Sequence, residues 1–408
     1  MSTSENESEL EERASDEAEP ILDPVRGVVA RAQGEDEPQP GVGLCLSGGG
    51  YRAMLFHLGA LWRLNEIGWL PRLNRVSSVS GGSITAGVLA CAWNELGFQN
   101  GVAPREKFEE HVVGPLRRLA EVTIDEKSVL TGILLPGASI ADRVAKAYRE
   151  HLFGRRTLQD LPDEGPGTPR FVFNATNVQT GSLWRFSKKY MADHQVGQVK
   201  NPTIQLAVAV AASSAFPPVL SPMVMKLPKG AVTAFDDGTV PKYAKAPFTT
   251  RVVLTDGGVY DNMGLETIWK NYQTVLVSDG GQEMDPEAEP HADWAHHALR
   301  VNALIDHQVR SLRRRQVVGS LVAKHRSGAF WPMSADIYRL SAPHTLPCAH
   351  DQTLKLAATP TRLRHMDATL QERLINWGYA ICDASMRSFV DTTLSAPPGF
   401  PYPGSGVG

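Results

Sequence analysis

Three loops of the chain carry residues that could perform acyl-transfer chemistry. The first, Ser47–Arg52, holds three consecutive glycines between a short apolar run and an amphipathic segment. Glycine loses more conformational freedom on folding than any other residue, so the run costs stability unless its backbone is needed. The N–H groups of Gly48, Gly49 and Gly50 could converge at a helix N-terminus and hold a phosphate or the oxyanion of an acyl-transfer intermediate. A tight turn that requires positive φ is the alternative explanation.

The second loop, Ser78–Gly82, offers a nucleophile. Its sequence, SVSGG, is similar to the G-x-S-x-G elbow, in which a sharp turn between strand and helix lifts a serine hydroxyl above the sheet. The serine is Ser80, where the dipole of the following helix would favour developing negative charge. Ser78 stands where the elbow has its first glycine. If its side chain crowds the turn, Ser78→Gly should leave activity unchanged or raise it. An ordinary Ser/Gly helix cap would have the same composition.

The third loop, Thr255–Gly264, offers a general base. Asp256 directly follows an apolar run and precedes two glycines, so its carboxylate can turn toward a neighbouring strand end. A general base must lie within hydrogen-bond reach of the nucleophile that it deprotonates. The unperturbed pKa of an aspartate is ~3.9, so Asp256 needs burial or suitable neighbours to act as a base. The chain repeats the tripeptide at Asp279–Gly281, which indicates that Asp-Gly-Gly alone also fits a simple turn.

Strands and helices must bring these loops together. The chain reads strand (42–46), glycine loop, helix (54–62), strand (74–79), serine loop and helix (83–93). This order is typical of an α/β sheet with parallel strands, in which ligands collect at the carboxyl ends of the strands. Further strands are expected at 171–175, 251–254 and 274–277, with a helix at 203–215 that begins at Asn201-Pro202.

Composition predicts one large domain between two tails. Residues 1–40 carry 12 acidic and 3 basic side chains and no aromatic residue, which indicates a disordered acidic tail. The domain covers 41–395, with a core at 41–282 and a helical extension at 283–395 that ends in a helix at 366–392. Residues 396–408 are rich in Pro and Gly and are expected to fray.

Charge and cysteine content exclude several classes of function. The formal net charge of −3 is far from the basic balance of a nucleic-acid-binding domain. The four cysteines lie far apart without CxxC or Cys/His spacing, which argues against a disulfide framework and a structural zinc site. The first residues lack the features of a signal peptide, and no run approaches the ~18 apolar residues of a membrane span. We therefore expect a cytoplasmic protein.

Taken together, the three loops resemble the motifs of the patatin-like phospholipases, a family of lipid acyl hydrolases. The family's G-G-G-x-R block is matched by Gly48–Arg52, and its serine elbow by Ser80, about 30 residues later. Its D-G-G/A block is matched by Asp256 with the two glycines that follow. Asn262 and the segment Ser213–Pro217 also fit the family's pattern, and the resemblance covers residues 41–282.

The resemblance implies a three-layer α/β/α fold with mostly parallel strands and a Ser–Asp dyad without a catalytic histidine. Ser80 would attack the carbonyl of a glycerolipid or simpler acyl ester, Asp256 would accept its proton, and Gly48 to Gly50 would hold the oxyanion. Arg52 would support the glycine loop or contact a lipid phosphate. The family's chemistry implies no metal or other cofactor, and the implied partner is the lipid substrate; no protein partner or nucleic acid is implied.

Two alternative functions stay open. A Ser-His-Asp triad esterase would recruit one of the eight histidines that follow Asp256, although none lies in a distinctive turn: His291, His296, His297, His307, His325, His344, His350 and His365. His57, behind the glycine loop, is expected to pack in the core. A non-catalytic lipid-binding member of the family would use the glycine loop only as an anion cradle. A nucleotide-binding P-loop is excluded because no Lys-Ser/Thr follows the glycines.

Peripheral membrane contact is predicted from a basic and aromatic stretch near the end of the core. Arg310, Arg313 and Arg314 recur at helical spacing, and four further basic or aromatic residues follow them: Lys324, Arg326, Phe330 and Trp331. Basic and aromatic side chains together suit an anionic lipid surface. A solvated basic helix face would give the same pattern.

Overall fold

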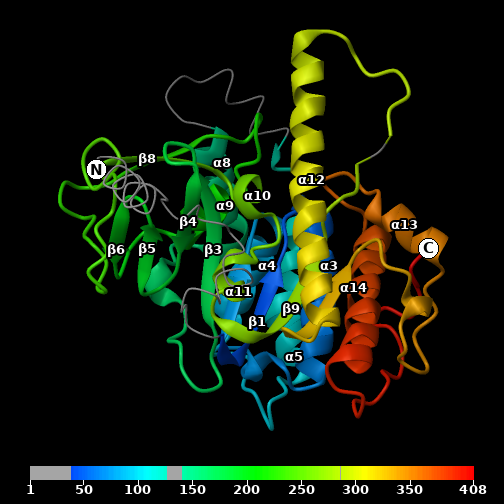
Figure 1. Ribbon diagram of the computed structural model, residues 1–408. Coiled ribbons are helices and arrows are strands. Elements are labelled where there is room, and N and C mark those ends of the chain that lie inside the picture. Colours follow the sequence, from blue (N-terminus) through cyan, green and yellow to red (C-terminus); the bar gives the residue numbers. More distant parts are fainter. Residues whose placement is uncertain (1–37, 126–139, 285) are drawn as a thin grey trace, which may run out of the picture.

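The computed structural model describes residues 38–125, 140–284 and 286–408. Within these residues, a ten-stranded mixed sheet lies between two layers of helices (Figure 1). The expected three-layer α/β/α class with a helical C-terminal region is confirmed. Residues 1–37 of the expected acidic tail (1–40) lie outside the described residues.

The elements have the following bounds. The strands are β1 (Gln39–Leu46), β2 (Arg75–Ser78), β3 (Arg170–Asn177), β4 (Ser182–Phe186), β5 (Tyr190–Asp193), β6 (Gly197–Lys200), β7 (Met223–Lys226), β8 (Arg251–Asp256), β9 (Tyr272–Asp279) and β10 (Ser327–Pro332). The α-helices are α3 (Gly50–Glu66), α4 (Gly81–Ala92), α5 (Arg105–Phe108), α6 (Gly114–Ala120), α8 (Ile140–Tyr148), α9 (Leu206–Ser213), α10 (Gly258–Asp261), α11 (Glu266–Trp269), α12 (Trp294–Val322), α13 (His350–Ala357) and α14 (Ala368–Phe389). Short 3-10 or π-helical turns lie at Leu70–Arg72, Glu109–Val113, Arg149–Phe153, Leu158–Asp160 and Ile337–Arg339.

The sheet has a parallel half and an antiparallel half. Its order begins β10-β9-β1-β2-β3, and every pairing in this half is parallel. Strands β4, β5 and β6 continue the sheet in antiparallel fashion beyond β3, and β8 pairs with β3 and β7, also antiparallel. The sequence predicts the parallel half but not the antiparallel meander, nor the strand β10 inside the stretch expected to be helical.

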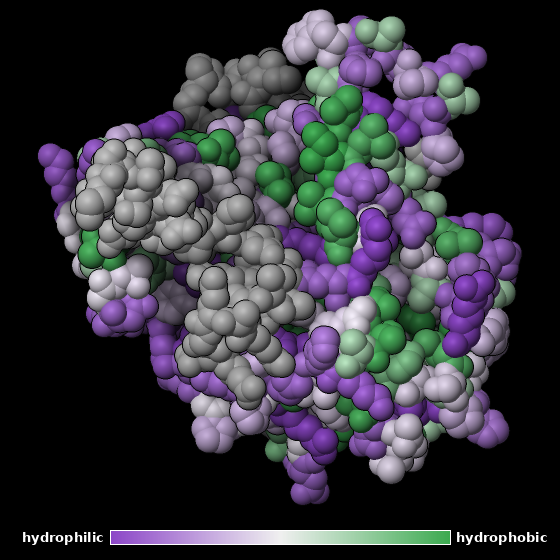
Figure 2. Space-filling view, viewed as in Figure 1, coloured by the Kyte–Doolittle hydropathy of each residue, from purple (hydrophilic) through white to green (hydrophobic). Residues whose placement is uncertain are grey.

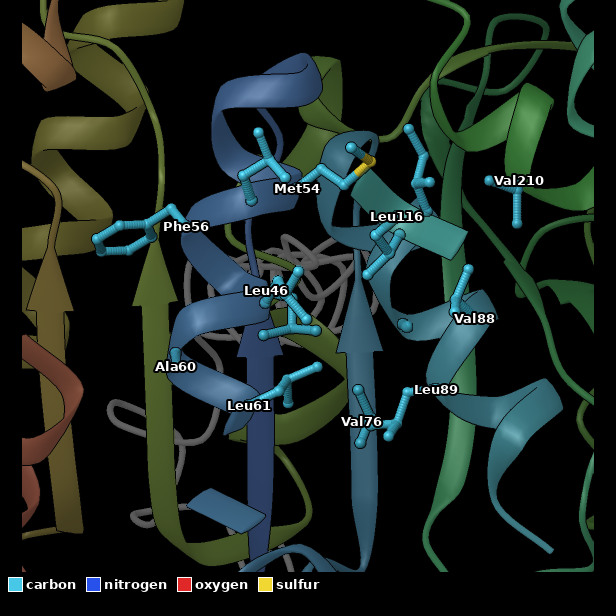
Figure 3. Packing of buried hydrophobic residues seen from close by; sticks show 14 of the residues in the cluster. Leu46, Met54, Phe56, Ala60, Leu61, Val76, Val88, Leu89, Leu116 and Val210 are labelled. Carbon is cyan, nitrogen blue, oxygen red and sulfur yellow. The ribbon is translucent and has the colours of Figure 1, made fainter. Parts of the chain in front are cut away.

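Both faces of the parallel half of the sheet are buried. Successive side chains of β1 show this, because they belong alternately to two different apolar cores. Leu44 and Leu46 belong to the larger apolar core, whereas Cys45 between them belongs to a smaller core on the other face. Successive side chains of a strand point to opposite faces, so a strand buried on both sides is apolar throughout. Figure 3 shows the larger core, where Leu46 and Val76 of the strands pack against Leu61 of α3 and Leu89 of α4.

Helix α14 packs closely on α3 and belongs to the core. A Cβ atom on Gly59 would lie 1.9 Å from the carbonyl oxygen of Ile375, and one on Gly378 would lie 1.9 Å from that of Phe56. The two glycines therefore allow the helix backbones to touch. The C-terminal helix, predicted as part of an extension, thus stabilises the helix that follows the glycine loop.

The Pro/Gly-rich end of the chain is packed, which corrects the expectation that residues 396–408 fray. The Asn376 amide donates hydrogen bonds to the carbonyl oxygens of Tyr402 and Gly406, both at 2.8 Å. Val407 is buried in the larger core. Hydrogen bonds from the Asn376 side chain of α14 to backbone carbonyl oxygens hold residues 396–408 in place, although their Pro/Gly-rich composition alone indicates mobility.

Arg313 and Arg314 of α12 pair with buried carboxylates of the protein body, so these two residues do not form the basic surface expected from the sequence. Arg313 pairs with buried Asp261 at 3.3 Å, and Arg314 pairs with buried Asp279 at 2.7 Å. Trp331, in β10, is fully buried. Among the helices of the described ranges, none combines the length and the apolar character needed to cross a bilayer.

Candidate active site

The carboxyl ends of β2 and β8 meet head-on beside β3. Strand β2 runs parallel to β3 and ends with Ser78 paired to Phe173, whereas β8 runs antiparallel and ends with Asp256 paired to Ala175. Both strands lie on the same side of β3 because β4 occupies the other side. The elbow that carries Ser80 and the carboxylate of Asp256 therefore approach each other from opposite directions along one strand.

Ser80 occupies a strained turn between β2 and α4. Its backbone angles are φ 52° and ψ −118°, a region that residues with a side chain rarely adopt. The glycines after it allow close contact with the first loop: a Cβ on Gly81 would lie 2.2 Å from the Gly50 carbonyl oxygen. A Cβ on Gly82 would lie 2.3 Å from that of Leu46. The predicted elbow is present, and it places Ser80 at the N-terminus of α4.

A buried chain of hydroxyl groups holds this elbow. The Ser80 N–H donates to Ser213 Oγ at 3.1 Å, and Ser213 Oγ lies 2.8 Å from Ser83 Oγ. Ser83 donates to Ser78 Oγ at 3.0 Å, and Ser78 donates to the Val172 carbonyl oxygen at 3.2 Å. The Ser78 hydroxyl therefore supports the turn, whereas the sequence motif raised only the hypothesis that this side chain crowds it.

Asp256 is a buried carboxyl, one oxygen of which is held by a backbone N–H. Its Oδ1 accepts a hydrogen bond from the Gly258 N–H at 2.7 Å. Its Oδ2 is buried and has no hydrogen bond of good geometry within the described residues. Burial is the main cause that raises the pKa of Asp256, hydrogen bonding from Gly258 and from the Ser80 hydroxyl lowers it, and the negative charge of Asp306 adds a smaller rise; the resulting pKa is about 7. The residue thus has the pKa that a general base needs near neutral pH.

The glycine loop lies against the serine elbow. A Cβ on Gly48 would lie 3.2 Å from the Cβ of Ser80, and the Gly48 N–H donates to the Asn262 carbonyl oxygen at 2.9 Å. Gly49 and Gly50 have φ values of 145° and 60°, which suit glycine. They begin α3, where backbone N–H groups have no acceptor inside the helix. The start of α3 therefore favours a bound anion beside Ser80. The N–H of Gly48 is not available for this, because it donates to the Asn262 carbonyl oxygen.

Two buried side chains, His57 and Arg52, form hydrogen bonds with the glycine loop and with the neighbouring loop at Gly280. His57 lies with Nε2 2.9 Å from the Ser47 carbonyl oxygen and Nδ1 2.8 Å from Ser278 Oγ. Burial lowers the pKa of His57 to about 4, so the ring is neutral, and its Nε2–H donates to the carbonyl. Arg52 donates to the Gly280 carbonyl oxygen at 2.9 Å. His57 packs in the core as expected, and the Arg52 guanidinium contacts the loop at Gly280 and also lines the cavity.

A cavity of about 860 Å³ gathers most of the predicted site residues. Its lining includes Gly48, Gly49, Arg52, Ser80, Asp256 and Asn262. Gly50 is buried outside the lining, where a Cβ would lie 2.6 Å from the Arg362 carbonyl oxygen. None of the histidines in the described residues lines the cavity.

The opposite wall of the cavity comes from α12, which the sequence reasoning did not connect with the site. Leu299, Ile305 and Val309 line it together with the charged pair Asp306 and Arg310. The signal was present in the sequence, because Ile305 and Val309 are separated by one helical turn. What the sequence lacks is any indication that this helix stands opposite Ser80.

The family comparison agrees with this geometry. A family model described as patatin-like phospholipase matches residues 44–269, more than half of the chain, and the match contains all three loops. The chain belongs to the patatin-like phospholipase family. The match to the patatin-like model ends in α11, so α12 and its cavity wall lie beyond it. No curated protein sequence matches the chain.

Solved structures that match the chain include human and bacterial proteins. Human GIVD cytosolic phospholipase A2, in complex with methyl gamma-linolenyl fluorophosphonate, is 15% identical, with a TM-score of 0.47, 89% of this patatin-like chain covered and 60% of that one. VipD from Legionella pneumophila is 16% identical, with a TM-score of 0.33 and coverages of 85% and 66%. The type III effector ExoU of Pseudomonas aeruginosa is 13% identical, with a TM-score of 0.30 and coverages of 85% and 52%. The chain thus spans half to two thirds of the length of these proteins.

Proposed function

We propose that the protein is a lipid acyl hydrolase in which Ser80 and Asp256 form a catalytic dyad. The observation that carries the proposal is the head-on approach of β2 and β8, which brings the strained Ser80 elbow to the buried carboxyl of Asp256. Membership of the patatin-like phospholipase family supports a lipid ester as the substrate.

In the proposed reaction, Asp256 takes the proton of the Ser80 hydroxyl while Ser80 Oγ attacks the ester carbonyl carbon. The tetrahedral intermediate collapses, and the proton passes from Asp256 to the departing alcohol. Water then gives a proton to Asp256, attacks the acyl-enzyme and releases the fatty acid, while Ser80 regains its proton. A pKa of about 7 leaves a large fraction of Asp256 ionised at neutral pH, as this role requires.

The oxyanion would be held by the N–H group of Gly49, which lines the cavity just before α3. Gly50, also expected from the sequence to take part, is buried outside the cavity lining. Gly48, expected from the sequence to share this task, donates its N–H to the Asn262 carbonyl oxygen. We therefore assign Gly48 to the support of the loop. Hydrogen-bond donors fixed in advance stabilise the developing charge without reorganisation during the reaction.

The acyl chain would occupy the apolar part of the cavity. Leu299, Ile305 and Val309 of α12 line the same cavity as Ser80 and Asp256. A volume of about 860 Å³ lies in the range typical of ligand sites in proteins. The Asp306–Arg310 pair in the same wall suits the polar part of a glycerolipid near the ester.

The two alternatives are less well supported. A triad esterase needs a histidine beside Ser80, and within the described residues no histidine lines the cavity. A purely lipid-binding protein would not need a strained serine facing a carboxyl whose pKa is raised to about 7.

A fluorophosphonate probe tests the proposal directly. The reagent should label Ser80, identified by peptide mass spectrometry, and the label should disappear in Ser80→Ala. Asp256→Asn should retain the fold, judged by circular dichroism, and lose most labelling. Labelling of a different serine at the same rate would overturn the assignment.

A further inference from the structure

Helix α12 is joined to the protein body by its second half. The buried side chains within this fully described helix are Arg313, Val317 and Ser320. Figure 1 shows the first half rising above the sheet. At 1.5 Å per residue, the stretch from Trp294 to Leu312 is about 27 Å long. Such a length of helix is exposed to solvent unless another surface covers it.

This exposed half carries a continuous line of apolar side chains. Trp294, Val301, Ile305 and Leu312 follow one another at spacings of seven, four and seven residues, which places them on one side of an α-helix. All are exposed, with Trp294 at 85% and Leu312 at 59%. We call this line, together with its exposed neighbours, the apolar stripe: Trp294, Val301, Leu304, Ile305, Val309 and Leu312. Figure 2 shows hydrophobic surface along this part of the helix.

The apolar stripe continues into the mouth of the cavity that holds Ser80. Ile305 and Val309 belong to the stripe and also line the cavity. Phe216 and Val259 line the cavity from other elements, and both are exposed at 54%. A surface that covered the stripe would therefore also reach the entrance to the site.

Charge around the stripe opposes an anionic partner. The described residues between Glu283 and Leu312 include five acidic and two basic side chains. Of the two basic ones, Arg300 pairs with Glu287 and Arg310 pairs with Asp306. A cluster of Lys and Arg would attract anionic lipid, and the stripe carries no such cluster. Its binding energy must come from apolar contact.

We propose that the apolar stripe docks the protein on uncharged lipid surfaces, with α12 lying in the interface and the cavity mouth against the lipid. This inference rests on the proposed function, because a lipid acyl hydrolase must receive its substrate from an aggregate. Interfacial helices bind in proportion to the apolar area that they bury. Phosphatidylcholine, which has no net charge, matches the stripe, whereas a phosphatidylserine surface is repelled by the acidic residues beside it.

Vesicle flotation of the full chain tests this proposal with Ser80→Ala as the parent, so that the lipid stays intact. The stripe variant carries Trp294→Glu and Leu312→Glu, two exposed positions outside the cavity lining. The control is Val322→Glu, an apolar residue of the same helix that is 77% exposed and lies outside the stripe. On phosphatidylcholine vesicles, we expect the stripe variant to bind at least about tenfold more weakly than the parent, and the control to match the parent.

Three results would overturn the docking surface. The stripe variant could float like the parent, or added phosphatidylserine could strengthen parent binding. Light scattering could instead show a dimer that the stripe substitutions dissociate, in which case a second copy covers the stripe.

A soluble ester separates this inference from the proposed function. In the Ser80 background, p-nitrophenyl butyrate should be hydrolysed equally by the native protein and the stripe variant, while hydrolysis of phosphatidylcholine vesicles falls only in the variant. Vesicle binding without turnover of any ester would refute the catalytic proposal and leave the docking surface standing. Ester turnover without vesicle binding would refute the docking surface alone.

Discussion

The backbone N–H of Ser80 donates to the hydroxyl of Ser213, 3.1 Å away, and so ties the nucleophile elbow to the end of α9. The same helix end also holds the other member of the proposed dyad. The Asp256 N–H donates to the Ala215 carbonyl oxygen at 2.9 Å, and the Gly257 N–H donates to that of Ser213 at 3.2 Å. One short segment, Ser213–Ala215, therefore positions both the serine and the aspartate.

Loss of either dyad residue should abolish most activity. Ser80→Ala and Asp256→Asn should each lower kcat by roughly 10³-fold or more on a soluble ester, and the double variant should be little worse than either single one. Rates of p-nitrophenyl ester hydrolysis measure this.

Asp279→Asn is the matched control for this prediction, because it alters the second Asp-Gly-Gly. Asp279 pairs with Arg314, which lowers its pKa despite burial. Its loss should reduce thermal stability and leave far more activity at low temperature. Additive losses in the dyad double variant, or equal inactivation by Asp279→Asn in folded protein, would contradict the dyad.

The rate should depend on the ionisation of Asp256. Because burial and the Asp306 charge raise its pKa to about 7, kcat/KM for a soluble ester should fall as pH drops through about 7. Asp306→Asn removes one negative charge and should move this acid limb to lower pH. Glu289→Gln, an exposed change upstream of α12, should leave the limb in place. A pH–rate profile of each variant measures the position of the acid limb. An acid limb that does not move in Asp306→Asn would refute the electrostatic coupling between Asp306 and Asp256.

The same carboxyl should cost the protein stability at high pH. Its pKa is ~3.9 when unfolded and about 7 when folded, so the folded state favours the protonated form. The penalty grows as pH rises from about 4 to 7 and then stays constant. Asp256→Asn should therefore stabilise the fold at pH 8 by on the order of 4 kcal/mol, and by little at pH 4. Urea unfolding at both pH values measures this, and an equal effect at the two values would exclude a raised pKa.

Ser78→Gly should impair the elbow, contrary to the expectation from the sequence motif. The Ser78 hydroxyl accepts from Ser83 and donates to the Val172 carbonyl oxygen. Its removal leaves Ser83 short of a buried partner and should cost about 1 kcal/mol of stability, with a moderate loss of kcat. Thermal melts and ester kinetics measure both effects. Unchanged stability with higher activity would favour the crowding hypothesis.

Two helical glycines should respond in opposite ways to alanine. A Cβ on Gly59 would meet the Ile375 carbonyl oxygen at 1.9 Å, so Gly59→Ala should separate α3 from α14 and cost roughly 3 kcal/mol or more. Gly319, in α12, has open space around it, so Gly319→Ala should stabilise the helix by up to about 1 kcal/mol. Chemical denaturation of both variants provides the comparison. Similar effects would mean that the α3–α14 contact is looser than described.

The local parts of the site could be predicted from the sequence, and the long-range parts could not. The elbow at Ser80 and the loop before α3 depend on neighbouring residues and their spacing, which the sequence displays. The direction of β8 depends on its pairing with β3, and nothing near Asp256 reveals it. Likewise, Arg313 has the same sequence context whether it faces solvent or pairs with Asp261, which belongs to a distant segment.

Strands β2 and β8 both pair with β3, so β3 determines the distance between their carboxyl ends. Ser78 is opposite Phe173 and Asp256 is opposite Ala175, so the spacing of the proposed nucleophile and the proposed base is set by a third strand that supplies neither. One extra residue in β3 between these positions would move the two ends apart by ~3.3 Å and turn one of them to the other face of the sheet. Side-chain substitutions around the cavity can thus alter the substrate, while a change in the length of β3 would dismantle the chemistry.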